Sequence, residues 1–334
     1  MSQFAHLLEV EHPYPFDLGR ILYFFAERQS ILKKKLAGEP RPWSTDPIFN
    51  EYRFCNVDRM DDAVTIWIQE NIVKPYKDHP DLWLMLAFAR WINWPPTLDE
   101  MVKSGVWFGD PAHSLEALAD AMQARQNRGE KVYTGAYMIR AESNKTVPWF
   151  SKSKHWFICN IVVGNLINNR VELEALLNKP DCTLEEFHAA ICFNDRFPNW
   201  GGFMTYELVT DLNHTRYLED APDRYTFSNL GPGANRGMNR LRGDKLEKIN
   251  SQQTWMEHSA QVLEGVLWAY DTGLIPNDLF ERHQLDMRAV ESAHCETDKM
   301  LRVLNGEGRP RSRYVHHTYN DAVEPPSTQD LQTL

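Results

Sequence analysis

Two acidic residues and a histidine lie at helical spacing in the segment Phe203–His214. Glu207 and Asp211 are four residues apart and His214 follows three residues later, so a helix would place all three on one face. Two neighbouring carboxylates repel each other unless a cation, a substrate amine or a shared proton compensates them. One acid could act as a general base, or the trio could hold a divalent metal ion. The alternative is a solvent-exposed acidic face with no chemical role.

A second charged stripe is predicted on the helix Met287–Leu304. Its members recur every three or four residues: Arg288, Glu291, Cys295, Asp298 and Arg302. Alternating charges at this spacing usually form a ladder of ion pairs on the surface. The two acids could instead face a substrate, and the spacing alone does not separate these interpretations.

A turn followed by a helix start is predicted at Leu230–Arg240. Gly231 and Gly233 permit backbone angles that other residues avoid, and the first N–H groups of the next helix would suit a phosphate. Arg236 and Arg240 add positive charge. This layout is typical of a helix-hairpin-helix turn that grips a nucleic-acid backbone, although a helix start with a solvated basic face would look the same.

A second candidate anion site lies near the N-terminus. Asn56 is a plausible N-cap for a helix over Val57–Val73, and Arg53 and Arg59 bracket the expected helix start. Two arginines beside free N–H groups would suit phosphate. The alternative is a capped helix with two surface arginines.

The composition limits the classes of function. The 334 residues carry 36 Lys and Arg against 46 Asp and Glu, a net charge of −10, which argues against a general DNA-coating protein but permits an enzyme with a basic cleft. The five cysteines form no C-x-x-C pair, so neither a structural zinc site nor a disulfide framework is expected. P-loop, dinucleotide-binding and zinc-deaminase motifs are absent from the sequence. Without a signal peptide or a long apolar run, we expect a soluble intracellular protein that does not contact a membrane.

Helical periodicity runs through nearly the whole chain and predicts an all-α fold. The expected helices are Leu18–Leu36, Val57–Val73, Pro80–Ile92, Ser114–Arg125, Trp156–Leu177, Leu184–Phe193, Phe203–His214, Ala234–Leu241, Thr254–Thr272 and Met287–Leu304. Val132–Arg140 could be a short strand or a turn. Residues 1–305 are expected to form a single helical catalytic unit, or two closely associated helical subdomains around a cleft. Residues 306–334 are expected to form a tail that is first basic and then disordered.

Five motifs, taken in order, resemble a family of bacteriophage enzymes. The motifs are YRFCNVDRMDDAVT (Tyr52–Thr65), VYTGAY (Val132–Tyr137), GGFMTYELVTDLNHT (Gly201–Thr215), LGPGANRGMNRL (Leu230–Leu241) and VESAHCETDKMLRVLNGEGRPRSRY (Val290–Tyr314). They are similar to the alpha-glutamyl/putrescinyl-thymine pyrophosphorylases, which include amino acid:DNA transferases of thymine hypermodification. They also resemble the helical domain attached to phage hydroxymethyluracil DNA kinases. Ala289 and Glu207 depart from the family pattern, where Asp and Gln are usual.

The resemblance implies a fold, a reaction and a set of residues. The implied architecture is that of the helical DNA glycosylases with a helix-hairpin-helix. The implied reaction, in the host cytoplasm during infection, displaces pyrophosphate from pyrophosphorylated 5-hydroxymethyluracil in double-stranded DNA with an amine or amino acid. The target base would be flipped out of the duplex. The resemblance leaves the cofactor unspecified. The implied catalytic residues are Asp211, Glu207, Glu291 and Asp298. The implied substrate- and DNA-binding residues are Arg53, Asn56, Arg59, Tyr206, Gly231, Gly233, Arg236, Arg240 and Lys299, with Asp62 and Thr65 also matching. A base-excising glycosylase and a non-catalytic DNA-binding module are the alternatives.

Overall fold

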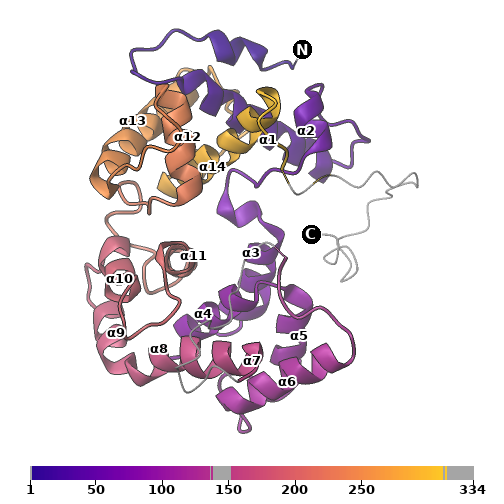
Figure 1. Ribbon diagram of the computed structural model, residues 1–334, viewed down its shortest axis with the longest axis vertical. Coiled ribbons are helices and arrows are strands. Elements are labelled where there is room, and N and C mark those ends of the chain that lie inside the picture. Colours follow the sequence, from indigo (N-terminus) through magenta and orange to yellow (C-terminus); the bar gives the residue numbers. More distant parts are fainter. Residues whose placement is uncertain (1, 136, 138–151, 311–312, 314–334) are drawn as a thin grey trace. The chain divides into compact units, whose positions relative to one another are not determined.

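The chain folds into helices joined by turns. The computed structural model describes residues 2–135, 137, 152–310 and 313, and within these residues it contains no strand, only an isolated antiparallel bridge between Tyr52 and Arg313. The all-α fold expected from the sequence is therefore confirmed. The described residues form two compact units (Figure 1). Of the described residues, those up to Asp62 and those from Arg224 onward form unit 1, and those between Ala63 and Asp223 form unit 2.

Unit 1 is built around three long helices from both ends of the chain. Its elements are η1 (Ala5–Glu9), α1 (Leu18–Leu36), α2 (Pro47–Glu51), η2 (Arg59–Asp61), α12 (Pro232–Arg242), α13 (Gln252–Asp271), η5 (Arg282–Gln284) and α14 (Met287–Leu304). Helices α1, α13 and α14 supply most of an apolar core. Helix α12 lies unusually close to α14. A Cβ atom added to Gly237 would come within 2.1 Å of the His294 carbonyl oxygen. Only glycine permits this approach.

Unit 2 is built around one fully buried helix. Its elements are α3 (Ala63–Ile68), the π-helical turn η3 (Gln69–Val73), α4 (Leu82–Ile92), α5 (Pro95–Lys103), α6 (Leu115–Asn127), α7 (Lys154–Phe157), the π-helical turn η4 (Ile158–Val163), α8 (Gly164–Asn168), α9 (Arg170–Leu177), α10 (Leu184–Ile191) and α11 (Gly202–Leu212). Every residue of α4 is buried, and α4 packs against α11, η4, α5 and η3. A helix that is apolar nearly all round requires neighbours on every side.

The predicted helices are confirmed with small shifts except in two places. The helix expected over Val57–Val73 is broken, because Asp58 and Asp62 both have extended backbone angles. The helix expected over Trp156–Leu177 is divided into α7, η4, α8 and α9. Helices α2 and α5 were not predicted because proline begins each of them, and proline is well tolerated in the first helical turn.

The helix-hairpin-helix is not shown. The turn at Gly231 leads into α12, with Gly231 as its N-cap, but residues 213–231 before it, all of which the structure describes, contain turns rather than a helix. Of the Val132–Arg140 segment, residues 136 and 138–140 lie outside the described residues. The same holds for residues 311–312 and 314–334 of the predicted tail. Within the described part of the chain, every helix is too short or too polar to cross a membrane.

Candidate functional site

A buried arginine organises the charged residues of unit 2. Arg90 extends from α4, and its guanidinium binds Asp211 of α11 through two hydrogen bonds, one from Nε to Oδ2 and one of 2.7 Å from Nη2 to Oδ1. Nη2 also donates to Thr65 Oγ1 at 2.8 Å, and Nη1 donates to Asn93 Oδ1 at 3.1 Å. The arginine is thus held in one orientation by three helices and the C-cap of α4.

This arrangement overturns the expectation of a solvated acidic face. The side chains of Asp211 and Arg90 are each only 1% exposed, and both carboxylate oxygens of Asp211 accept hydrogen bonds from the guanidinium. A two-point ion pair of this kind fixes the orientation of both side chains. Asp211 is therefore better suited to positioning Arg90 than to collecting a proton. Its catalytic role stays a prediction.

Glu207 lies one turn before Asp211 on the same helix and is also buried. Its side chain is 1% exposed, and its Oε2 accepts a hydrogen bond of 2.9 Å from the Tyr137 hydroxyl. The neighbouring Tyr206 is 4% exposed, and its ring lies edge-on to the His188 imidazole at 6.4 Å. No three His, Cys, Asp or Glu side chains converge as metal ligands within the described residues, so the metal interpretation of this helix finds no support.

The stripe predicted on α14 is a buried network rather than a surface ladder. Glu291 is 8% exposed and Asp298 is 3% exposed. Arg288 donates to Glu291 at 2.5 Å. Asp298 accepts a hydrogen bond of 2.6 Å from Arg240 of α12, while Arg236 and Arg302 lie within 3.6 Å and 3.3 Å of it. The sequence therefore identified the charged residues of this stripe, but the prediction that they form a ladder on the surface was wrong.

The same helix holds two further residues beside the segment Tyr52–Arg59. Glu296, which carried no distinguishing signal in the sequence, is 3% exposed and accepts hydrogen bonds from Lys299 at 2.5 Å and from the Cys55 backbone N–H at 3.2 Å. Burial works against the ammonium of Lys299, but the Glu296 carboxylate raises its pKa. This contact brings the N-terminal motif and the α14 motif together within unit 1.

Asn56 does not cap a helix, so that prediction is wrong. Asp58 caps the short η2 turn instead, and Asn56 accepts a hydrogen bond from Arg28 of α1 while donating to the Asp61 carbonyl at 2.5 Å. Arg28 was not recognised from the sequence, since an arginine on the polar face of a long helix carries no distinguishing signal. Arg53 and Arg59 are half-buried in this segment.

The start of α12 faces α14. A Cβ atom on Gly233 would come within 2.8 Å of the Cys295 sulfur, and one on Gly231 would come within 3.8 Å of Glu291 Oε1. The side chain of Arg240 is 6% exposed and is held by Asp298 and Glu307, while Arg236 is 37% exposed. Of the two arginines predicted to contact DNA phosphates, Arg236 is therefore the more accessible.

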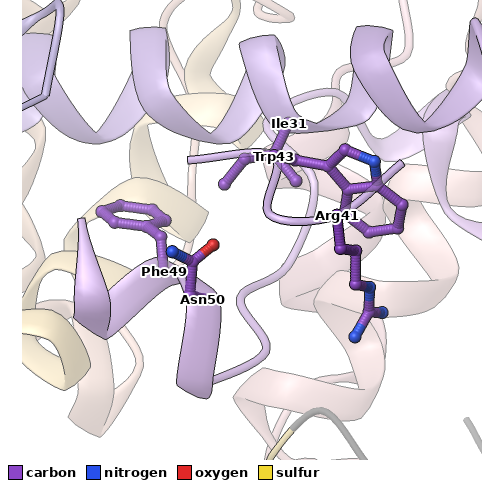
Figure 2. Close-up of a pocket in the computed structure, with 5 residues that line it drawn as sticks. All are labelled: Ile31, Arg41, Trp43, Phe49 and Asn50. Atoms are coloured by element: carbon purple, nitrogen blue, oxygen red, sulfur yellow. The ribbon is translucent and has the colours of Figure 1, made fainter. Parts of the chain in front are cut away.

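One small pocket of unit 1 lies apart from all of these residues. It is lined by Ile31, Arg41, Trp43, Phe49 and Asn50 (Figure 2). The Arg41 guanidinium lies 4.6 Å from the centre of the Trp43 ring and thus covers that ring. The pocket contains none of the residues that the sequence singled out.

Two features of the molecule define its class. It is a purely helical chain in its described part, and it buries charged residues on α4 and α11 in unit 2 and on α14 in unit 1. Residues 18–309 match the family model described as the helical domain of 5-hmdU DNA kinase. The chain belongs to this family, as one of the two resemblances drawn from its motifs had indicated.

A curated relative agrees with this assignment. The 5-hmdU DNA kinase of Bacillus phage SP10 is 26% identical over 296 residues, which cover 83% of this chain and 44% of the relative. The chain thus spans less than half the length of that relative. No solved structure matches, so the likeness to helical DNA glycosylases stays a prediction.

Proposed function

We propose that this chain acts on DNA that carries 5-hydroxymethyluracil in a phage-infected cell, as a transferase that replaces a pyrophosphate on the base with an amine or amino acid. The family match covers residues 18–309 and therefore all the residues proposed for catalysis and DNA binding. The relative is named as a kinase, but the 334 residues of this chain contain no P-loop motif. A reaction on the already phosphorylated base is the step that these residues suit.

The observation that carries the proposal is the burial of acidic side chains at the motif positions. Asp211, Glu207 and Asp298 are 1%, 1% and 3% exposed. Burying charge is unfavourable for folding unless partners compensate it, and such networks are concentrated at functional sites. A domain that served only to support another would gain the same stability from apolar side chains.

The chemistry requires a cation for the leaving group and a base for the nucleophile. The amine nitrogen attacks the methylene carbon on C5 of the uracil, the carbon–oxygen bond to pyrophosphate breaks, and the electron pair departs with pyrophosphate. Arginines held rigidly, as Arg90 is by Asp211, would stabilise the developing negative charge. A carboxylate must take the proton that the nitrogen loses. We assign that role in this chain to Glu207, because both oxygens of Asp211 already bind Arg90. Since glutamine is usual at this position in the family, the role of Glu207 as a base would be particular to this chain.

Nucleoside mass spectrometry tests the proposal. Duplex DNA with pyrophosphorylated 5-hydroxymethyluracil is incubated with the protein and a panel of amines and amino acids, and is then digested to nucleosides. We expect a nucleoside whose mass corresponds to an amine on the methylene carbon. The Glu207→Gln variant should form it about a hundredfold more slowly, the range typical for loss of a general base, with DNA affinity unchanged.

The same digestion distinguishes the alternatives. Release of a free base with abasic DNA would identify a glycosylase. Tight DNA binding with no altered nucleoside would identify a binding module. Either result would contradict the transferase.

A further inference from the structure

Three lysines of unit 2 lie against aromatic rings. The Lys131 ammonium is 3.6 Å from the centre of the Trp94 ring, that of Lys154 is 4.4 Å from the Tyr133 ring, and that of Lys152 is 5.2 Å from the Trp156 ring. We call these three lysines and three rings the lysine–aromatic surface. None of the motifs singled out for catalysis supplies a lysine to it.

The parts of this surface are neighbours in space. Lys131 and Tyr133 are two residues apart, as are Lys152 and Lys154, and the contact of Lys154 with the Tyr133 ring joins the two segments. The Tyr133 hydroxyl and the His155 Nδ1 are 2.5 Å apart, and the two rings stack at 16°. The surface is therefore held by fixed contacts rather than by mobile side chains alone.

The hydrogen-bond partners of His155, which lies beneath the lysine–aromatic surface, indicate which of its ring nitrogens carries the proton. His155 Nε2 lies 2.6 Å from Gln126 Oε1 and must donate to it, so in the neutral ring Nδ1 accepts the Tyr133 proton. Burial first, and then the charge of Lys154, lower the pKa of His155. The imidazole is therefore neutral near pH 7 and adds no charge to the surface.

Three other lysines of the same unit each pair with a carboxylate. Lys74 pairs with Glu70, Lys103 pairs with Asp99, and Lys179 pairs with Glu186. Within the part of the chain that the structure describes, no carboxylate lies within ion-pair distance of Lys131, Lys152 or Lys154. In a protein with a net charge of −10, three uncompensated cations side by side are a local exception.

A bound anion would stabilise the charged form of these lysines. Burial lowers the pKa of Lys131 and of Lys154, and no acidic neighbour among the described residues opposes that shift. An ammonium over a ring keeps N–H donors directed away from the ring, and these can reach a phosphate. Of the three rings, those of Tyr133 and Trp156 are partly exposed, whereas that of Trp94 is buried. Cations beside partly exposed rings are typical of surfaces that follow a nucleic-acid strand, with phosphates on the cations.

We propose that the lysine–aromatic surface binds the phosphate backbone of the DNA on which the protein acts. This inference rests on the proposed function only in taking DNA as the partner. It adds a contact surface in unit 2 that is separate from the arginines of α12 and from the Arg90 cluster.

The test compares two triple variants of the full chain. The first is Lys131→Gln, Lys152→Gln and Lys154→Gln. The matched control is Lys74→Gln, Lys103→Gln and Lys179→Gln, which changes the net charge equally within the same unit. Circular dichroism checks that both variants fold. The affinity for a labelled duplex of about 20 bp containing 5-hydroxymethyluracil is then measured between about 50 and 200 mM salt, the range in which phosphate contacts dominate.

The expected result is a smaller salt dependence in the first variant only. Removing one phosphate contact reduces the slope of log affinity against log salt by about 0.9, so the slope should fall by about 2 to 3. A slope equal to that of the control, or a wild-type protein that does not bind duplex DNA, would overturn the proposal. Product formation is followed separately: product with an unchanged slope refutes the surface alone, and a changed slope without product refutes the transferase alone.

Discussion

Replacing Asp211 by asparagine should destabilise unit 2 strongly. The substitution preserves the shape of the side chain but leaves the Arg90 guanidinium, 1% exposed, without a negative partner. Removing one member of a buried ion pair costs about 3–5 kcal/mol, because the remaining charge stays desolvated. We therefore expect the free energy of unfolding of unit 2 to fall by about that amount.

A double-mutant cycle separates the ion pair from its surroundings. Arg90→Met alone should destabilise the unit comparably, since it leaves the Asp211 carboxylate buried. The double variant combines the same two substitutions, Arg90→Met with Asp211→Asn, and removes both charges. Thr65 and Asn93 then lose a donor, at about 1–3 kcal/mol each at most, a loss that Arg90→Met alone already contains. The summed decreases in the free energy of unfolding of the two single variants should therefore exceed the decrease in the double variant by about 2 kcal/mol or more.

The assay is urea unfolding at pH 7, followed by tryptophan fluorescence. Trp91, which follows Arg90 in α4, packs edge-on against Trp200 at 5.7 Å and reports on this region. Because the chain has two compact units, the curves are analysed for two transitions. Asp99→Asn, which breaks a surface pair with Lys103, is the control and should change stability by less than about 1 kcal/mol. A loss below about 1 kcal/mol for Asp211→Asn, with additive single changes, would refute the argument.

Three further predictions concern unit 1 and its contacts. His258 Nε2 lies 3.0 Å from His294 Nε2, and burial lowers the pKa values of the two imidazoles to about 2 and about 4. Unfolding therefore takes up protons below pH 6.5, and the free energy of unfolding should fall there by roughly 1.4 kcal/mol per pH unit per histidine. Denaturant titrations from about pH 7.5 to 5 check this, and a flat profile would contradict it. Gly237→Ala should destabilise the α12–α14 contact by about 1–3 kcal/mol or more, whereas Gly135→Ala in unit 2, which meets nothing within 4 Å, should be nearly neutral in thermal unfolding. Asp298→Asn should lower the unfolding midpoint, because three arginines share that carboxylate; an unchanged midpoint would show that the network contributes nothing to stability.

The sequence predicted the helices better than the environment of the charged residues. Periodicity located α1 and α14 with the bounds that the structure has, because each presents one apolar face to a core. Periodicity cannot tell whether a charged residue on the other face meets solvent or another helix. One interpretation of the sequence thus placed Asp211 in water, whereas its partner Arg90 lies 121 positions away along the chain.

One signal for the site was present in the sequence but was not used. Arg90 stands in the run LWLMLAFARWI, where every other residue is apolar. An arginine in a helix that must be buried needs a carboxylate partner, and this requirement alone would have marked the position. The broken helix after Asn56 carried no comparable signal, because Asp58 and Asp62 suit both a cap and a first turn.

The most direct test of the proposed transferase measures pyrophosphate release with and without an amine. Duplex DNA bearing pyrophosphorylated 5-hydroxymethyluracil is mixed with the protein, and released pyrophosphate is quantified against the amine incorporated. If the amine nitrogen displaces the leaving group, release depends on the amine and matches incorporation one for one. Release at the same rate without any amine, or no release with the whole panel, would contradict the account.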